Sequence, residues 1–158
     1  MFTDEGRRYV RGNRTAKCSY AWLESPEVSG FEGKLVIRAK FTGRSGWDVF
    51  GRCVGMGDSF DLRIAATAVY DNGNIAFREV SAAPEGKGGF YASRVSSTIA
   101  GSLQRDFRYP IAADAKRVLE DPGANPQYPR QLERFHVPAV RVTADSLVLV
   151  LDFLISVK

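Results

Sequence analysis

The side chains best suited to chemistry in this chain are a few carboxylates, one histidine and two cysteines. Asp61 and Glu79 lie on predicted strands, and carboxylates on neighbouring strands can share acid–base work. His136 is the only histidine, and the chain has no Gly-x-Ser-x-Gly elbow to present a serine nucleophile. We therefore expect solvated carboxylates and no catalysis. A small hydrolase or isomerase that uses these three residues is the enzyme alternative.

The two cysteines, Cys18 and Cys53, allow one disulfide and do not demand it. With a single histidine, a structural zinc site would be short of ligands. The sequence therefore predicts no metal and no other cofactor. A bridged cysteine pair would favour an oxidising compartment such as the periplasm.

A glycine-rich segment, residues 51–58, invites comparison with phosphate-binding loops. It lacks the Gly-Lys-Ser/Thr ending of those loops, and it leads into a predicted strand where they lead into a helix. We expect turns or bulges here, with turns at residues 43–46 and 55–58 on either side of a strand.

Positive charge is concentrated near the N-terminus. The formal net charge is +4, and the first seventeen residues alone hold five basic and two acidic side chains. We expect residues 1–15 to form a basic arm or short helix. Such an arm would suit an anionic membrane surface, met through Arg7, Arg8, Arg11 and Arg14, or an acidic partner. The alternative is a solvated helix or tail. The nearly neutral remainder argues against nucleic-acid binding.

The length and hydropathy of the chain limit its organisation and location. A length of 158 residues suits a single domain covering residues 1–158. No apolar run reaches the roughly 20 residues that span a bilayer, and the first residues do not form a leader peptide. We expect a periplasmic or membrane-associated protein if a leader has been removed, and a cytoplasmic one otherwise.

Apolar residues at alternating positions predict antiparallel strands. Leu35, Ile37 and Phe41 alternate with polar residues, which leaves Val36 on the outward face. Residues 60–70 repeat the pattern and end at Asp71-Asn72-Gly73, where Asn-Gly favours a tight hairpin turn. The last strand, residues 146–157, is apolar on both faces and therefore needs cover on both.

The apolar period changes from two to about four in the second half of the chain. Tyr91, Val95, Ile99, Leu103 and Phe107 fall four apart, beside the small residues Ala92, Ser96 and Ala100. This spacing predicts one long helix over residues 91–119. Pro110 should kink or interrupt this helix, because its ring removes a donor and crowds the preceding turn.

Together these elements resemble the tubular lipid-binding (TULIP) superfamily. The resemblance rests on the strand at 60–70 with its Asn-Gly turn, the helix at 91–119 broken at Pro110, and the ending at 140–149. It implies an α+β fold in which a curved antiparallel β-sheet wraps around a long kinked helix in the C-terminal half. The bacterial members that it is most similar to are small envelope proteins of obscure function.

The predicted function is therefore non-enzymatic binding of a lipid or another lipophilic small molecule in a cleft between sheet and helix. Apolar wall residues would contact the ligand: Trp22, Phe41, Ile64, Val95, Ile99, Leu103, Leu149 and Phe153. The alternative is a structural or protein-interaction domain with a fully packed core. In that case the last strand would pair with a partner chain, for example in a homodimer.

Overall fold

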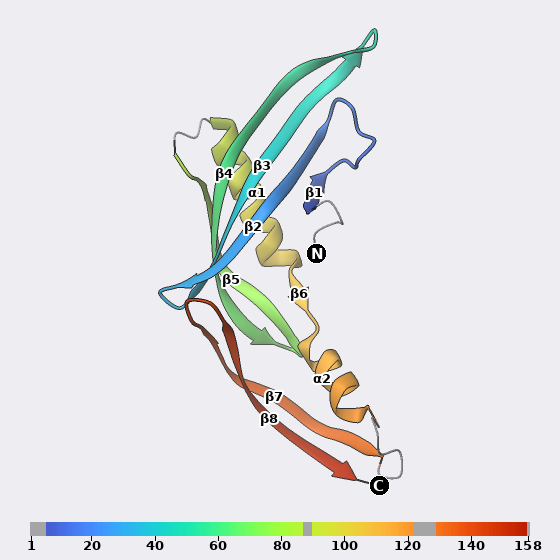
Figure 1. Ribbon diagram of the computed structural model, residues 1–158, viewed down its shortest axis with the longest axis vertical. Coiled ribbons are helices and arrows are strands. Elements are labelled where there is room, and N and C mark those ends of the chain that lie inside the picture. Colours follow the sequence, from blue (N-terminus) through green and yellow to red (C-terminus); the bar gives the residue numbers. More distant parts are fainter. Residues whose placement is uncertain (1–5, 87–89, 122–128, 158) are drawn as a thin grey trace. The chain divides into compact units, whose positions relative to one another are not determined.

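The computed structural model describes residues 6–86, 90–121 and 129–157, which form eight strands and two helices. Their order along the chain is shown in Figure 1. The elements are β1 (Arg7–Arg11), β2 (Tyr20–Phe31), β3 (Lys34–Val49), β4 (Arg52–Asp71), β5 (Asn74–Pro84), α1 (Phe90–Asp106), β6 (Arg108–Tyr109), α2 (Ile111–Glu120), β7 (Arg130–Val142) and β8 (Leu147–Val157).

Strands β1 to β6 form one sheet in their sequence order, and β7 and β8 form a second, two-stranded sheet. Three connections in the first sheet are two-residue turns with positive φ at both central residues: Glu32-Gly33, Phe50-Gly51 and Asn72-Gly73. Positive φ at both positions is typical of type I′ turns, whose twist matches that of the flanking antiparallel strands.

The expected α+β fold around one long kinked helix is wrong, because the described chain is mainly β with two short helices. Helix α1 has 17 residues and α2 has 10. Between them β6 pairs with β5 through Ile75↔Tyr109 and Ala76↔Arg108. Pro110 biases the residue before it toward extended backbone, so the chain joins the sheet there and does not continue the helix.

Of the two structures expected for residues 1–15, the short helix is wrong where the structure describes these residues. Residues 7–11 form β1, which pairs antiparallel with β2 from Arg7↔Glu24 to Arg11↔Ala21. A segment this short gains its backbone hydrogen bonds more readily from a neighbouring strand than from an isolated helical turn. Residues 12–15 are not helical either, and residues 1–5 of the expected segment lie outside the described residues.

The turns expected at residues 43–46 and 55–58 are absent, since β3 and β4 run through both segments. The glycines there allow close backbone approach. A Cβ on Gly46 would lie 2.7 Å from the Val54 carbonyl oxygen, and one on Gly55 would lie 2.2 Å from that of Ser45. Glycine in these strands therefore marks crowding between backbones rather than a change of direction.

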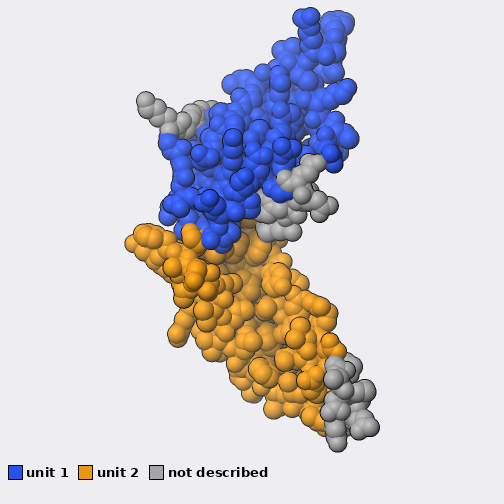
Figure 2. All heavy atoms as spheres, viewed as in Figure 1, with its two compact units in different colours: residues 1–28, 36–65, 81–101 blue, residues 29–35, 66–80, 102–158 orange. Residues whose placement is uncertain are grey.

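The chain divides into two compact units, coloured separately in Figure 2. Unit 1 comprises residues 1–28, 36–65 and 81–101, and unit 2 comprises residues 29–35, 66–80 and 102–158. Strands β2 to β5 and helix α1 each contribute residues to both units.

The core of unit 1 combines large sheet residues with small helix residues. Phe41, Leu62 and Ile64 are buried on the sheet, and Ala92 and Ser96 are buried on α1. Small side chains let a helix approach a sheet closely, and the Tyr91 hydroxyl lies 3.2 Å from where a Cβ on Gly43 would stand. The buried Ser96 hydroxyl donates to the Ala92 carbonyl oxygen at 2.8 Å, so it keeps a hydrogen bond.

The core of unit 2 is a cluster of Ala66, Ala68, Ile75 and Phe77. Phe107 packs against this cluster, and its ring stacks on that of Phe77 with centroids 4.0 Å apart. Val140, Val142 and Leu149 bring the second sheet onto the same cluster. Apolar residues from five strands contribute to this cluster, together with Phe107 before β6 and Ile111 after it. The cluster therefore holds unit 2 together.

Candidate functional site

The eight predicted ligand-contact residues do not lie in one unit. Five belong to unit 1 and three, Leu103, Leu149 and Phe153, belong to unit 2. In unit 1, Phe41, Ile64 and Ile99 are buried, and Val95 and Trp22 are half-buried. In unit 2, Leu103 and Leu149 are half-buried and Phe153 is exposed.

The contacts of these residues within unit 1 are those of a protein core and its border. The Phe41 ring packs against Phe60 with centroids 4.9 Å apart. Trp22 stacks on Tyr20 at 4.8 Å, and the guanidinium of Arg7 lies 4.9 Å from the centre of its indole ring. A lipophilic ligand between sheet and helix therefore stays a prediction, because the described contacts of these side chains are with other protein groups.

The residues of the enzyme alternative are all exposed, and Asp61 lies in unit 1 whereas the other two lie in unit 2. Glu79 accepts a hydrogen bond from Thr67 at 3.1 Å and pairs with Lys34 at 3.5 Å. His136 meets the ring of Tyr70 edge-on at 5.6 Å. Within the described part of the chain none of the three hydrogen-bonds to another. Their surroundings are those of surface strand residues.

Metal ligation has no candidate within residues 6–86, 90–121 and 129–157, where no three His, Cys, Asp or Glu side chains gather around one point. The same residues contain no helix long and apolar enough to span a membrane.

One exposed pair of side chains has shifted pKa values. The Tyr109 hydroxyl donates to the Asp114 carboxylate at 2.6 Å. This hydrogen bond lowers the pKa of Asp114, with a further contribution from Arg117, and it raises the pKa of Tyr109. Both groups are at the surface where β6 leads into α2, so the pair is best read as a local structural contact.

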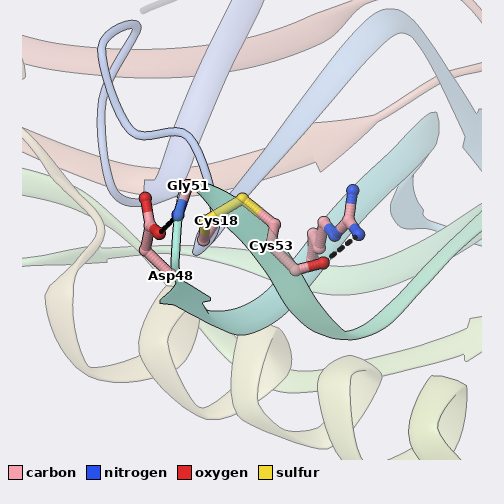
Figure 3. The surroundings of a disulfide bond; sticks show 5 residues. Cys18, Asp48, Gly51 and Cys53 are labelled. Atoms are coloured by element: carbon pink, nitrogen blue, oxygen red, sulfur yellow. Dashed lines mark hydrogen bonds between the residues drawn. A yellow bond between two sulfur atoms is a disulfide. The ribbon is translucent and has the colours of Figure 1, made fainter.

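Cys18 and Cys53 form a disulfide, which decides between the two alternatives that the sequence left open. The bond joins the segment before β2 to β4, one residue after its start (Figure 3). Beside it the Asp48 carboxylate accepts the Gly51 backbone N–H at 2.7 Å, and the Arg44 guanidinium donates to the Cys53 carbonyl oxygen at 3.2 Å. The disulfide therefore ties the end of the β3–β4 hairpin to the segment before β2, and the two hydrogen bonds lie within the hairpin itself.

That hairpin end carries a group of exposed apolar side chains that the sequence patterns did not reveal. We define the hairpin tip as Trp47, Val49, Phe50, Val54 and Met56, all of which are exposed. Phe50 is 102% exposed, Trp47 76% and Met56 73%. Alternation along the strand would place Trp47 in the interior, yet it is exposed. The only sequence signal for exposure is the Phe-Gly pair, whose turn character is weak beside that of Asn-Gly.

A second exposed apolar surface lies on β8, whose two apolar faces the sequence had already identified. We define the β8 surface by its exposed members: Leu147, Val148, Val150, Leu151, Phe153, Leu154 and Val157. Leu149 packs against the unit 2 core, while its strand neighbours on both faces are 40–45% exposed. The cover that two apolar faces require is therefore incomplete in the described chain.

Comparison with known proteins adds no further constraint, since no family model, curated protein or solved structure matches the chain.

Proposed function

We infer that this protein is a non-enzymatic interaction module in which β8 pairs with β8 of a second copy of the chain. The observation that carries this function is the β8 surface, an eleven-residue strand with exposed apolar side chains on both faces. Such a strand is a ready template for adding another strand, which would cover its backbone edge and part of both faces.

The edge of β8 is the open side of the two-stranded sheet. Within the described residues its ladder partner is β7, with pairs from Arg130↔Val157 to Val142↔Leu147. On β7, in contrast, the Leu132 backbone N–H donates to the Glu120 side chain of α2 at 2.9 Å. Soluble proteins usually protect an open edge with lysine, proline or a bulge. The two register shifts of this hairpin lie on β7, and β8 has none of these devices.

The composition of β8 favours a symmetric partner. Its one charged residue, Asp152, pairs with Arg134 of β7 at 3.2 Å, so the strand presents no unpaired charge. An antiparallel pair of identical strands matches apolar faces of equal length around a twofold axis. Like charges directly opposite each other destabilise a strand pair, so we place the axis away from Asp152.

Edge charges test this dimer without breaking the β7–β8 ladder. The variant Leu151→Lys/Leu154→Lys places two ammonium groups per chain on exposed β8 positions, where pairing would desolvate them. Sedimentation equilibrium should show a dimer for the wild type and a Kd at least about 100-fold weaker for the variant. Val118→Lys changes an exposed apolar residue of α2 in the same unit and should dimerise as the wild type does. A wild type that stays monomeric to about 100 μM would overturn the proposal.

The disulfide supports a location for this module. Protein disulfides persist in oxidising compartments and are rare in the reducing cytosol. The Cys18–Cys53 bond therefore favours the periplasm or the cell exterior. Thiol labelling of protein from the intact cell compartment, without reductant, should leave both cysteines unmodified.

A further inference from the structure

The hairpin tip of unit 1 has an apolar face whose geometry follows from its turn. Strand β3 ends at Val49 and β4 begins at Arg52, so the two-residue turn Phe50-Gly51 places Trp47 opposite Val54. The close approach of Gly46 and Gly55, and the 3.2 Å hydrogen bond between Thr42 and Ser59, fit the same register. Because side chains alternate along a strand, one face carries Trp47, Val49, Arg52, Val54 and Met56.

The opposite face of this hairpin is covered at Cys53 and Gly46. It carries Cys53, which is bonded to Cys18, and Gly46, where an added Cβ would lie 3.2 Å from the Cys18 carbonyl oxygen. The segment around Cys18 therefore packs onto the glycine side. The apolar side has no such cover among the described residues, since Trp47, Val54 and Met56 are all exposed.

The residue at the point of the turn is in a conformation that does not suit it. Phe50 has φ of 51°, in the left-handed region that bulky residues rarely adopt, and its side chain gains no burial in return. Asparagine would occupy the same position without this strain, as Asn72 does in the β4–β5 turn. Strained residues of this kind cluster at binding sites, where the side chain serves a contact outside the chain.

Two basic side chains adjoin the disulfide beside the tip. Lys17 and Arg52 are exposed, and each is the immediate neighbour of a disulfide cysteine. Between residues 45 and 57 the charged side chains are Arg52 and Asp48, one of each sign, and Asp48 accepts the Gly51 N–H. Unit 1 as a whole holds twelve basic and eight acidic residues, whereas unit 2 holds ten of each. The net charge of the protein therefore resides in the unit that carries the tip.

We propose that the hairpin tip inserts into the interfacial region of an anionic lipid bilayer. Tryptophan is favoured at the level of the lipid headgroups, and the apolar Phe50 at the point of the turn would reach below it. Lys17 and Arg52 would meet lipid phosphates. The Gly51 N–H already donates a hydrogen bond to Asp48, so insertion does not leave this donor unpaired in the bilayer.

Co-sedimentation with lipid vesicles tests the proposal on the full oxidised chain. Phosphatidylcholine vesicles containing phosphatidylglycerol at a ratio of about three to one should bind the wild type, and pure phosphatidylcholine vesicles should bind it at least about fivefold more weakly. Phe50→Asn removes the apolar side chain and also relieves the strained φ, so it should fold at least as well. We expect this variant, combined with Trp47→Ala, to lose about tenfold or more of the binding to the anionic vesicles.

A matched control lies beside another two-residue turn. Phe31 is 58% exposed next to Glu32-Gly33, so Phe31→Ala removes an exposed aromatic ring from a hairpin outside the tip. It should bind as the wild type does. In a Trp22→Phe background, which leaves Trp47 as the only tryptophan, emission should shift to the blue on adding anionic vesicles.

Three results would overturn the proposal. The first is absence of wild-type binding to the anionic vesicles, and the second is equal binding by wild type and Phe50→Asn/Trp47→Ala. The third is self-association in the absence of lipid that this double variant abolishes, which would make the tip a protein contact. The dimer variant Leu151→Lys/Leu154→Lys changes unit 2 and should keep full vesicle affinity per chain, so failure of one proposal is separable from failure of the other.

Discussion

Two hairpin turns of this protein have nearly the same backbone but opposite surroundings. Phe50-Gly51 in unit 1 has φ values of 51° and 80°, and Asn72-Gly73 in unit 2 has 47° and 82°. A Cβ on Gly51 would meet nothing within 4 Å, whereas one on Gly73 would lie 3.3 Å from the Ala112 side chain of α2. The Gly73 carbonyl also accepts the Ala112 N–H at 2.9 Å.

The difference shows that one turn is part of the fold and the other projects from it. Asn72 suits the left-handed backbone that its turn requires, and α2 supports that turn. Phe50 suits neither the backbone nor exposure to water, so its identity is not explained by the stability of the turn. Unit 1 holds this projecting hairpin with a disulfide, while unit 2 supports its turn through packing and the Ala112 hydrogen bond from α2.

Removing the disulfide should produce the largest effect on this comparison. Cys18→Ser/Cys53→Ser opens a link across 35 residues, and loop entropy predicts a loss of about 4 kcal/mol in the free energy of unfolding. Hydrogen exchange should show the loss in unit 1, around β3 and β4 near the tip, and should leave the Asn72-Gly73 turn protected. Equal loss of protection at both turns would mean that the disulfide does not distinguish the units.

Exchanging the turn residues should have an intermediate effect of opposite sign at the two sites. Phe50→Asn should raise the free energy of unfolding by about 1 kcal/mol, because asparagine tolerates positive φ better than phenylalanine does. Asn72→Phe should lower it by about 1 kcal/mol or more for the same reason. Urea denaturation of both variants measures the two changes. A destabilised Phe50→Asn would show that Phe50 makes a stabilising contact in the folded chain.

The smallest effect concerns the start of α2, which supports the Asn72-Gly73 turn. The pKa of Asp114 is below its ordinary value of 3.8, so its contribution to stability is present above that pH and is lost as pH falls through the folded pKa. The pKa of Tyr109 is raised above 10.0, so its contribution is present below pH 10.0 and is lost as pH rises through the folded pKa.

Tyr109→Phe removes the hydrogen bond that is the largest cause of both shifts. NMR titration should then find the pKa of Asp114 closer to 3.8 but still lowered by Arg117. An unchanged pKa of Asp114 in this variant would contradict the assigned cause. Tyr109 is exposed and Asp114 is half-buried at the surface, so we expect little change in unfolding at neutral pH.

Local sequence patterns predicted some elements correctly and failed at others for identifiable reasons. The Asn72-Gly73 turn and its flanking strands follow from residues whose local preference agrees with the fold. Val36 was assigned to an outward face but is buried. Buried residues do not alternate regularly along this part of β3, since Val36 and Ala39 are both buried although they are three positions apart. The expected long helix ended early because β5 offered residues 108–109 backbone partners that no helical period reveals.

The candidate sites were predictable only in part. The composition of the last strand predicted that both of its faces need cover, since ten of its eleven residues carry no charge. The hairpin tip did not follow, because Trp47 alternates as an interior residue would, and glycines nearby suggested turns at the wrong places.

The sequence by itself therefore determined the strand periodicity, the Asn-Gly hairpin, the interruption at Pro110 and the two apolar faces of β8. These depend on backbone preferences and spacing within a few residues. Tertiary structure decided the Cys18–Cys53 bond, the pairing of β6 with β5 and the exposure of Phe50 and Trp47. Each of these depends on which distant segments cover a residue or leave it in water, and that information is not local in the chain.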